Sequence, residues 1–175
     1  MTGLGLVLRR RGAQDEAVAR WRRAAAKPMV IAGAPRQSAR MPDDISYRWR
    51  APVTDAELFD LTTSHGGHPQ RGWWDRIRPH SLGWVSARLP DGALVGFVNL
   101  AWDGGDHAFV LDTKVRPDHQ RRGIATQLVA RATDAAREAG CEWLHVDFEE
   151  HLRTFYFDAC GFRSTDAGLI ALRSA

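Results

Sequence analysis

A short basic turn, Gln120–Thr126, carries residue types that bind phosphate groups. Its small residues, Gly123 and Ala125, would let a ligand approach the backbone closely, and Arg121 and Arg122 add positive charge. Apolar residues at positions 124, 128, 129, 132, 136 and 139 follow a helical period, so a helix begins at this turn. Because a helix N-terminus offers unpaired amides and the positive end of the helix dipole, we expect the turn to bind an anion.

Two other phosphate-binding loops do not fit the turn. A Walker loop ends in Gly-Lys-Ser/Thr, whereas Gly123 is followed by Ile124 and Ala125. A Rossmann fingerprint needs three glycines, and the basic turn has only Gly123. Both loops are therefore set aside.

An antiparallel meander of strands is expected to lead into the turn. The strand-like runs are Leu82–Leu89, Ala93–Trp102 and His107–Val115. Asp91-Gly92 between the first two runs is a strong hairpin signal, and Asp103–Asp106 turns the chain into the third. The last strand delivers the chain into the basic turn.

A strand and two helices are expected before the meander. Ile45–Arg50 alternates apolar and polar residues like a half-buried strand. Thr54 and Glu57 have the spacing of a capping box, which predicts a helix ending near Ser64. Gly72–Pro79 is expected to form a short second helix.

After the turn we expect a helix, a strand, a second helix and two final strands. Gly140 ends the first helix as a C′ glycine. Glu142–Phe148 is a strand reached through a helical crossover, so it should pair in parallel with its neighbour. The remaining elements are a helix from about His151 to Ala159 and strands at Gly161–Arg163 and Leu169–Leu172.

Two motifs in this layout resemble the GNAT superfamily of acyl-coenzyme-A-dependent N-acyltransferases. The first is Gln120-x-x-Gly123-x-Ala125 after a strand ending at Val115, and the second is the closing segment Phe155–Phe162, which ends in Gly-Phe. The resemblance extends from about residue 45 to residue 172. It implies an α/β (α+β) fold with a mixed, mostly antiparallel twisted sheet of about 6–7 strands flanked by about 4 helices.

The resemblance implies direct transfer of an acetyl group from acetyl-CoA to a primary amine of a small molecule or peptide, with no metal. The pyrophosphate of coenzyme A would lie on the basic turn, and its pantetheine arm would pair with the end of the preceding strand. The residues implied at these places are Thr113, Lys114, Val115, Gln120, Arg121, Arg122, Gly123, Ile124, Ala125 and Thr126.

Amine attack requires a group that accepts a proton, and several residues could supply it. Asp112 is the first choice, because a carboxylate between Leu111 and Thr113 in an apolar strand could have a raised pKa. Glu149 comes next, just past the fifth strand. Glu150, His151, His107 and Asp147 stay open, as does a water chain with no single essential base.

Tyr156 is the candidate proton donor to the departing thiolate, ahead of Cys160 and solvent. The family's common spacing places a tyrosine four residues before the glycine, where this chain has Phe157. A shift of one residue turns a side chain by about 100° unless the helix carries a bulge. The alternative is that Tyr156 is a core aromatic residue whose hydroxyl is already hydrogen-bonded, with no role in proton transfer.

The acceptor amine is expected to lie against His65, Trp73 and Trp74. Two rings beside a loop of glycine and histidine could form a pocket wall for a cationic amine. The alternative is that one tryptophan is core and the other lies at the surface. His65 and His68 have no third ligand at a recognisable spacing, so a metal site is not expected.

Charge divides the chain into two parts. Residues 1–40 hold nine basic and two acidic residues, and the remainder holds 15 basic and 19 acidic residues. We expect 1–40 to be a basic, disordered extension, which would be absent if translation starts at Met41, and 41–175 to be a single acetyltransferase domain. The acidic body argues against a nucleic-acid surface.

Other bulk features predict a cytoplasmic protein. No apolar run approaches the roughly 20 residues that span a bilayer, and the leader lacks the order of a secretory signal. Cys141 and Cys160 do not form a disulfide framework. The protein is expected to be a monomer or a homodimer. Two other functions stay open: a non-catalytic acyl-CoA-binding module, and nucleic-acid binding through residues 1–40.

Overall fold

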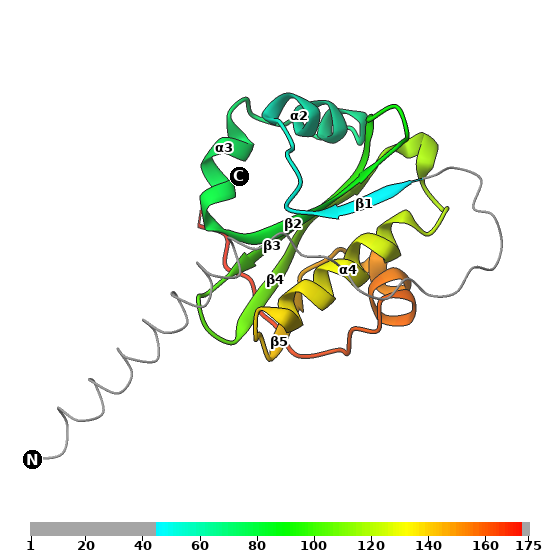
Figure 1. Cartoon of the computed structure of the whole chain (residues 1–175). Coiled ribbons are helices and arrows are strands. Elements are labelled where there is room, and N and C mark those ends of the chain that lie inside the picture. Colours follow the sequence, from blue (N-terminus) through cyan, green and yellow to red (C-terminus); the bar gives the residue numbers. More distant parts are fainter. Residues whose placement is uncertain (1–44, 173–175) are drawn as a thin grey trace, which may run out of the picture.

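The computed structural model describes residues 45–172. Within that range a sheet has the strand order β1-β2-β3-β4-β5 (Figure 1). Neighbouring strands from β1 to β4 are antiparallel, and β5 is parallel to β4. The strands are β1 Ser46–Trp49, β2 Ser81–Arg88, β3 Leu94–Trp102, β4 His107–Val115 and β5 Trp143–Val146.

Helices cover both faces of the sheet. α2 (Asp55–Ser64) and α3 (Trp73–Ile77) lie on one face, and α4 (Ile124–Glu138) crosses the other (Figure 1). Short 3₁₀ turns occur at Arg78–His80, Pro117–His119 and Glu150–Leu152, and Phe155–Ala159 forms a π-helical turn.

The larger core lies between the sheet and α4. Ile124 and Leu128 are buried against sheet residues that include Val98, Ala108 and Val110. Gly96 on β3 lets the helix approach closely, since a Cβ there would lie 2.9 Å from a Leu128 methyl carbon. This contact sets the position of the N-terminal turn of α4.

A second core holds α2 and α3 on the opposite face. Trp74 is fully buried, packs edge-on against Phe97 with ring centroids 5.2 Å apart, and donates its indole N–H to the Val53 carbonyl. Asp55 at the start of α2 accepts backbone N–H groups of Gly72 and Trp74 at 2.7 and 2.9 Å. These bonds fix the start of α3 beside α2.

β4 contains a bulge, and its pairing with β5 is short. Lys114 pairs with Phe97 and Leu111 pairs with Asn99, so two residues of β4 face one residue of β3 between them. Asp112 in the bulge has φ of 57°. β5 pairs with residues 107–110 of β4 only, and beyond them the two strands are no longer paired.

Most sequence-predicted elements are confirmed. The meander, the parallel fifth strand, the long helix and the capping box of Thr54 and Glu57 are all present. The helix expected near His151–Ala159 consists of a 3₁₀ turn and a π-helical turn. The basic extension expected at residues 1–40 lies outside the described residues.

The two predicted final strands are wrong. Residues 161–171 have no regular secondary structure, so the described chain has five strands where about 6–7 were expected. Gly161 has φ of 77°, and Leu169 and Ile170 are 84% exposed. These apolar side chains therefore bury little surface to stabilise a strand.

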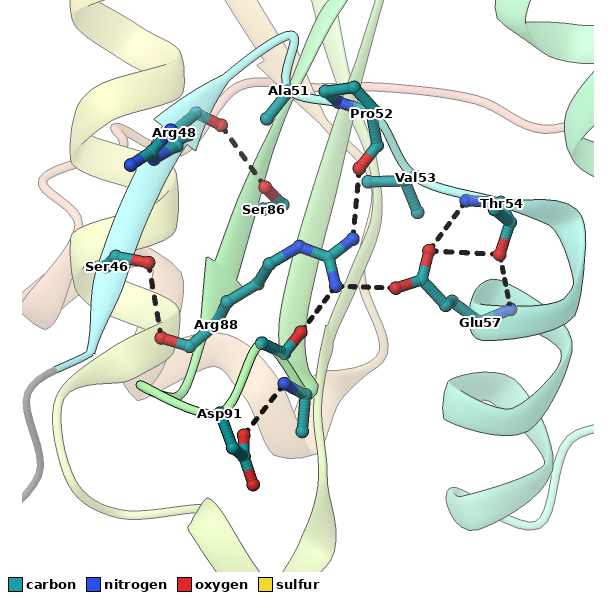
Figure 2. A network of polar contacts seen from close by, with 12 residues as sticks. Ser46, Arg48, Ala51, Pro52, Val53, Thr54, Glu57, Ser86, Arg88 and Asp91 are labelled. Atoms are coloured by element: carbon teal, nitrogen blue, oxygen red, sulfur yellow. Dashed lines mark hydrogen bonds and ion pairs between the residues drawn. The ribbon is translucent and has the colours of Figure 1, made fainter.

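An ion pair ties α2 to the β2–β3 hairpin (Figure 2). The Arg88 guanidinium donates to Glu57 at 2.5 Å and to the carbonyls of Gly92 and Pro52 at 2.7 and 3.0 Å. Burial raises the pKa of the Glu57 carboxyl, but hydrogen bonds from Arg88 and Thr54 outweigh it, so this pKa lies below its ordinary value of 4.5.

We expect Glu57→Gln to lower the free energy of unfolding at pH 7 by about 1 kcal/mol, after allowing for solvent screening of this partly exposed pair. Because the folded-state pKa is depressed, the stabilisation is present above pH 4.5 and is lost as the pH falls through the lower folded value. Urea unfolding should therefore show a larger difference in stability between wild type and variant at pH 7 than at pH 3. Asp60→Asn, in an exposed part of the same helix, is the control, and an equal difference at both pH values would contradict the assignment.

Candidate active site

A cavity of about 530 Å³ lies beside the N-terminus of α4. Its walls come from the end of α2, the end of β4, the basic turn and the segment after β5. The lining residues are His65, Thr113, Val115, His119, Gln120, Arg121, Gly123, Ile124, Ala125, Thr126, His151, Leu152, Phe155 and Tyr156. Of these, His119, Leu152 and Phe155 were not singled out from the sequence as site residues.

The N-terminus of α4 has features that can bind an anion. Gly123 is the N-cap residue with φ of 77°, and no side chain caps the helix. A Cβ on Gly123 would meet no atom within 4 Å, so the space above the turn is open. Uncapped amides of the first turn, the helix dipole and the Arg121 side chain therefore share one wall of the cavity.

The basic turn is braced against β4. The Gln120 side-chain amide donates to the Val115 carbonyl at 3.3 Å, and the Arg116 N–H donates to the Val95 carbonyl at 2.8 Å. Arg121 has φ of 59° and lines the cavity. Arg122, which was predicted with it, is not among the lining residues.

The end of β4 presents two polar groups at the cavity. The Val115 N–H donates to His65 Nε2 at 3.1 Å, so this imidazole nitrogen carries no proton. The Thr113 hydroxyl is buried and makes no hydrogen bond of ordinary geometry within the described chain. Both groups lie where the sequence predicted strand-like pairing with a ligand.

Tyr156 lies in the cavity wall because of the π-helical turn. The Cys160 N–H donates to the Phe155 carbonyl five residues earlier, at 3.0 Å, which adds a residue to the helical turn. Tyr156 is 6% exposed, and its ring stacks on Phe148 with centroids 4.9 Å apart. Burial raises the pKa of its phenol, which the nearby Thr113 side chain partly offsets and Cys160 reinforces, so the phenol is neutral at pH 7.

Asp112 and Lys114 lie at the bulge, outside the cavity lining. Their side chains form an ion pair of 3.2 Å. The Lys114 ammonium also donates to the Thr62 hydroxyl at 3.1 Å and lies 4.9 Å from the centre of the Trp73 ring. Lys114 therefore connects the bulge to α2 and α3.

The segment after β5 supplies further acid and base groups. Glu149 is exposed and lies 3.3 Å from His151 Nδ1. His151 lines the cavity, whereas Glu149 does not. Cys160 has a pKa raised by burial to about 11, so it is a thiol at neutral pH.

The predicted acceptor residues separate in the structure. Trp74 is in the core, Trp73 is half-buried beside Lys114, and His65 lines the cavity. No group of three His, Cys, Asp or Glu residues in the described range could hold a metal ion. None of the helices described is both long and apolar enough to cross a membrane.

Residues 47–162 match the Acetyltransferase (GNAT) family, so the chain belongs to that family. It is 29% identical over 109 residues to the mycothiol acetyltransferase of Mycolicibacterium vanbaalenii, in a match covering 62% of this chain and 35% of that protein. The chain thus spans about a third of the length of this curated relative.

Solved structures of the family have the same fold. A GNAT family acetyltransferase of Streptococcus pneumoniae superposes with a TM-score of 0.62 at 24% identity, over 74% of this chain and 99% of that chain. An Escherichia coli GNAT family N-acetyltransferase, solved in complex with CoA, gives a TM-score of 0.59 at 16% identity, over 73% of each chain.

Substitution of Gly123 tests the anion site. We expect Gly123→Leu to weaken coenzyme A binding by about tenfold or more in calorimetry, because a side chain would enter the open space above the helix N-terminus. Gly104→Leu is the matched control, since Gly104 also has positive φ and an open Cβ position but lies in the β3–β4 turn. Equal coenzyme A affinities for the two folded variants would rule out the anion site.

Proposed function

We propose that this chain transfers an acetyl group from acetyl-CoA to a primary amine by direct attack. The observation that carries the proposal is that the uncapped start of α4 and the buried phenol of Tyr156 line the same cavity. The first is a phosphate site and the second a proton donor. Membership of the acetyltransferase family supports the pairing of these two roles.

The donor would be held by the basic turn and by the end of β4. The amides of the first turn of α4, with Gly123 and Arg121, would take the pyrophosphate, and Gln120 would keep the turn against β4. Thr113, Lys114 and Val115 would supply backbone groups for the pantetheine arm. The open space at Gly123 and the place of Thr113 and Val115 in the cavity lining support this fit.

Proton transfers in the reaction would be divided between two sides of the opening between β4 and β5. The ammonium of the acceptor loses a proton to Asp112, directly or through water, with Glu149 as the second candidate. The amine nitrogen then bonds to the acetyl carbon while the carbon–sulfur bond breaks, and the nitrogen loses its excess proton to solvent to give the neutral amide. Tyr156 gives its phenolic proton to the departing sulfur, and solvent restores it.

Removal of the Tyr156 phenol and of the Asp112 carboxylate should change opposite limbs of the pH–rate profile. We expect Tyr156→Phe to lower kcat by about 100-fold and to remove any alkaline limb belonging to the phenol, because the proton donor is lost. Asp112→Asn should lower kcat and alter the acidic limb, since a base must be deprotonated to act. Both are measured by release of free thiol from acetyl-CoA with a panel of primary amines.

The same thiol-release assay distinguishes an acetyltransferase from a non-catalytic acyl-CoA-binding module. Saturable acetyl-CoA binding without thiol release from any amine would favour the non-catalytic acyl-CoA-binding module. An unchanged pH profile in Asp112→Asn would remove Asp112 as the base, leaving Glu149 or a water chain.

His65 should compete with the donor for the Val115 N–H. Because its Nε2 accepts that hydrogen bond, we expect His65→Ala to bind acetyl-CoA about threefold more tightly, which is the effect of one modest hydrogen bond. His68→Ala, in the same loop, should leave the affinity unchanged. Weaker binding by His65→Ala in calorimetry would mean that the imidazole holds the donor.

A further inference from the structure

An exposed apolar surface lies on the face of β4 and β5 that α4 does not cover. Ala108 and Val110 of β4 pack toward α4, with Leu144 and Val146 of β5 at the edge of the same core. Since side chains alternate along a strand, the residues between them face the other way. We call this surface the apolar strip, and it consists of Leu111, Phe109, His145 and Trp143.

The strip is partly exposed to solvent, and its middle is formed by aromatic rings in contact. Leu111 is 42% exposed, Phe109 38% and Trp143 55%. The Phe109 and His145 rings stack with centroids 4.8 Å apart and planes at 20°. The His107 and His145 rings have centroids 5.0 Å apart and ring nitrogens 2.7 Å apart. Single exposed apolar residues are ordinary, but a row of stacked rings favours a flat apolar ligand.

The strip ends at the proposed reaction site. β4 and β5 run in parallel, so Trp143 lies farthest from the basic turn, followed by Phe109 beside His145 and then Leu111. Leu111 is followed by the bulge that contains Asp112. With about 3.3 Å per residue, Leu111 and Phe109 are separated by about 7 Å, roughly the length of a phenyl ring with one or two methylenes.

Polar groups are gathered at the reaction end of the strip. Asp112 follows Leu111 directly, and exposed Asp147 follows β5. Asn99, which pairs with Leu111 across β3 and β4, is 2% exposed, and its Oδ1 has no hydrogen-bond partner among described residues. The reaction end therefore has oxygen acceptors, of which Asp112 is paired with the Lys114 ammonium. The far end has the Trp143 ring and the imidazoles of His107 and His145, whose ring nitrogens lie 2.7 Å apart.

We propose that the acceptor is a primary amine on a short linker to an aromatic or similarly flat apolar group, which lies on the apolar strip. Its ammonium group lies near Asp112 and Asp147 and its ring lies over Phe109 and Leu111. This assignment of the acceptor class rests on the proposed function.

The test compares amines that differ only in their apolar group. Thiol release from acetyl-CoA is measured with 2-phenylethylamine, 3-phenylpropylamine, ethanolamine and putrescine. We expect kcat/KM to be at least about tenfold higher for the phenyl amines, because one face of a ring is removed from water. Phe109→Ala should raise KM for 2-phenylethylamine about fivefold while the KM values for ethanolamine and acetyl-CoA stay unchanged.

Two controls test whether the strip is covered by the chain's own C-terminal segment or by a second copy of the protein. Ile170→Ala removes an apolar side chain that is 84% exposed and should change no KM value. An effect of Ile170→Ala equal to that of Phe109→Ala would assign the strip to the chain's own C-terminal segment. A dimer in light scattering that Phe109→Ala converts to a monomer would assign it to a second copy, and either result overturns the proposal.

Different results would overturn the acceptor class and the acetyltransferase activity. Thiol release at equal kcat/KM for phenyl and hydrophilic amines would overturn the aromatic acceptor and leave the acetyltransferase standing. No thiol release with any amine would overturn the proposed function and the acceptor class with it.

Discussion

The short parallel pairing between β4 and β5 is the constraint on which the site depends. The two strands pair only from His107 to Val110, and the bulge at Asp112 then changes the direction of β4 side chains. Had the pairing continued, backbone groups of Thr113 and Val115 would be occupied by β5 rather than directed at the cavity. Loss of pairing at this point opens the sheet between a helix N-terminus and a buried tyrosine.

The rest of the fold holds this opening in place from both faces. Gly96 lets α4 lie close to β3, which sets the position of Gly123 and the helix amides. On the other face, Trp74 and the Asp55 hydrogen bonds fix α3, and Lys114 connects the bulge to Trp73 and Thr62. The cavity is thus formed by loops whose ends are anchored in two separate cores.

Local patterns made much of the fold predictable from the sequence. Alternating residues and an Asp-Gly turn predicted the meander, the spacing of Thr54 and Glu57 predicted a capped helix, and the crossover predicted the parallel strand. The basic turn was found because glycine and arginine types at a helix start have a local physical meaning. These features depend on neighbours in the chain, so the sequence is sufficient to find them.

Features that depend on distant contacts were not predictable. The π-helical turn that brings Tyr156 to the cavity has no residue pattern of its own, and the hydrogen bond from Val115 to His65 joins residues 50 positions apart. The expected strands at Gly161–Arg163 and Leu169–Leu172 failed because an apolar run forms a strand only where a neighbouring edge and core receive it. Of the adjacent tryptophans, Trp74 is the core residue because it packs against Phe97 and Trp84, which are distant in the sequence.

One polar and one apolar surface lie at the opening between β4 and β5. The proposed donor site at the basic turn and the proposed acceptor site on the apolar strip meet where β4 and β5 cease to pair. We propose that the donor occupies the basic turn and the end of β4.

Backbone amide NMR during a coenzyme A titration tests that claim most directly. If the donor binds there, the amide chemical shifts of residues 113–115 and 121–126 should change saturably, and those of the β2–β3 hairpin should change little. Saturable binding that leaves the amides of residues 121–126 unmoved would contradict it.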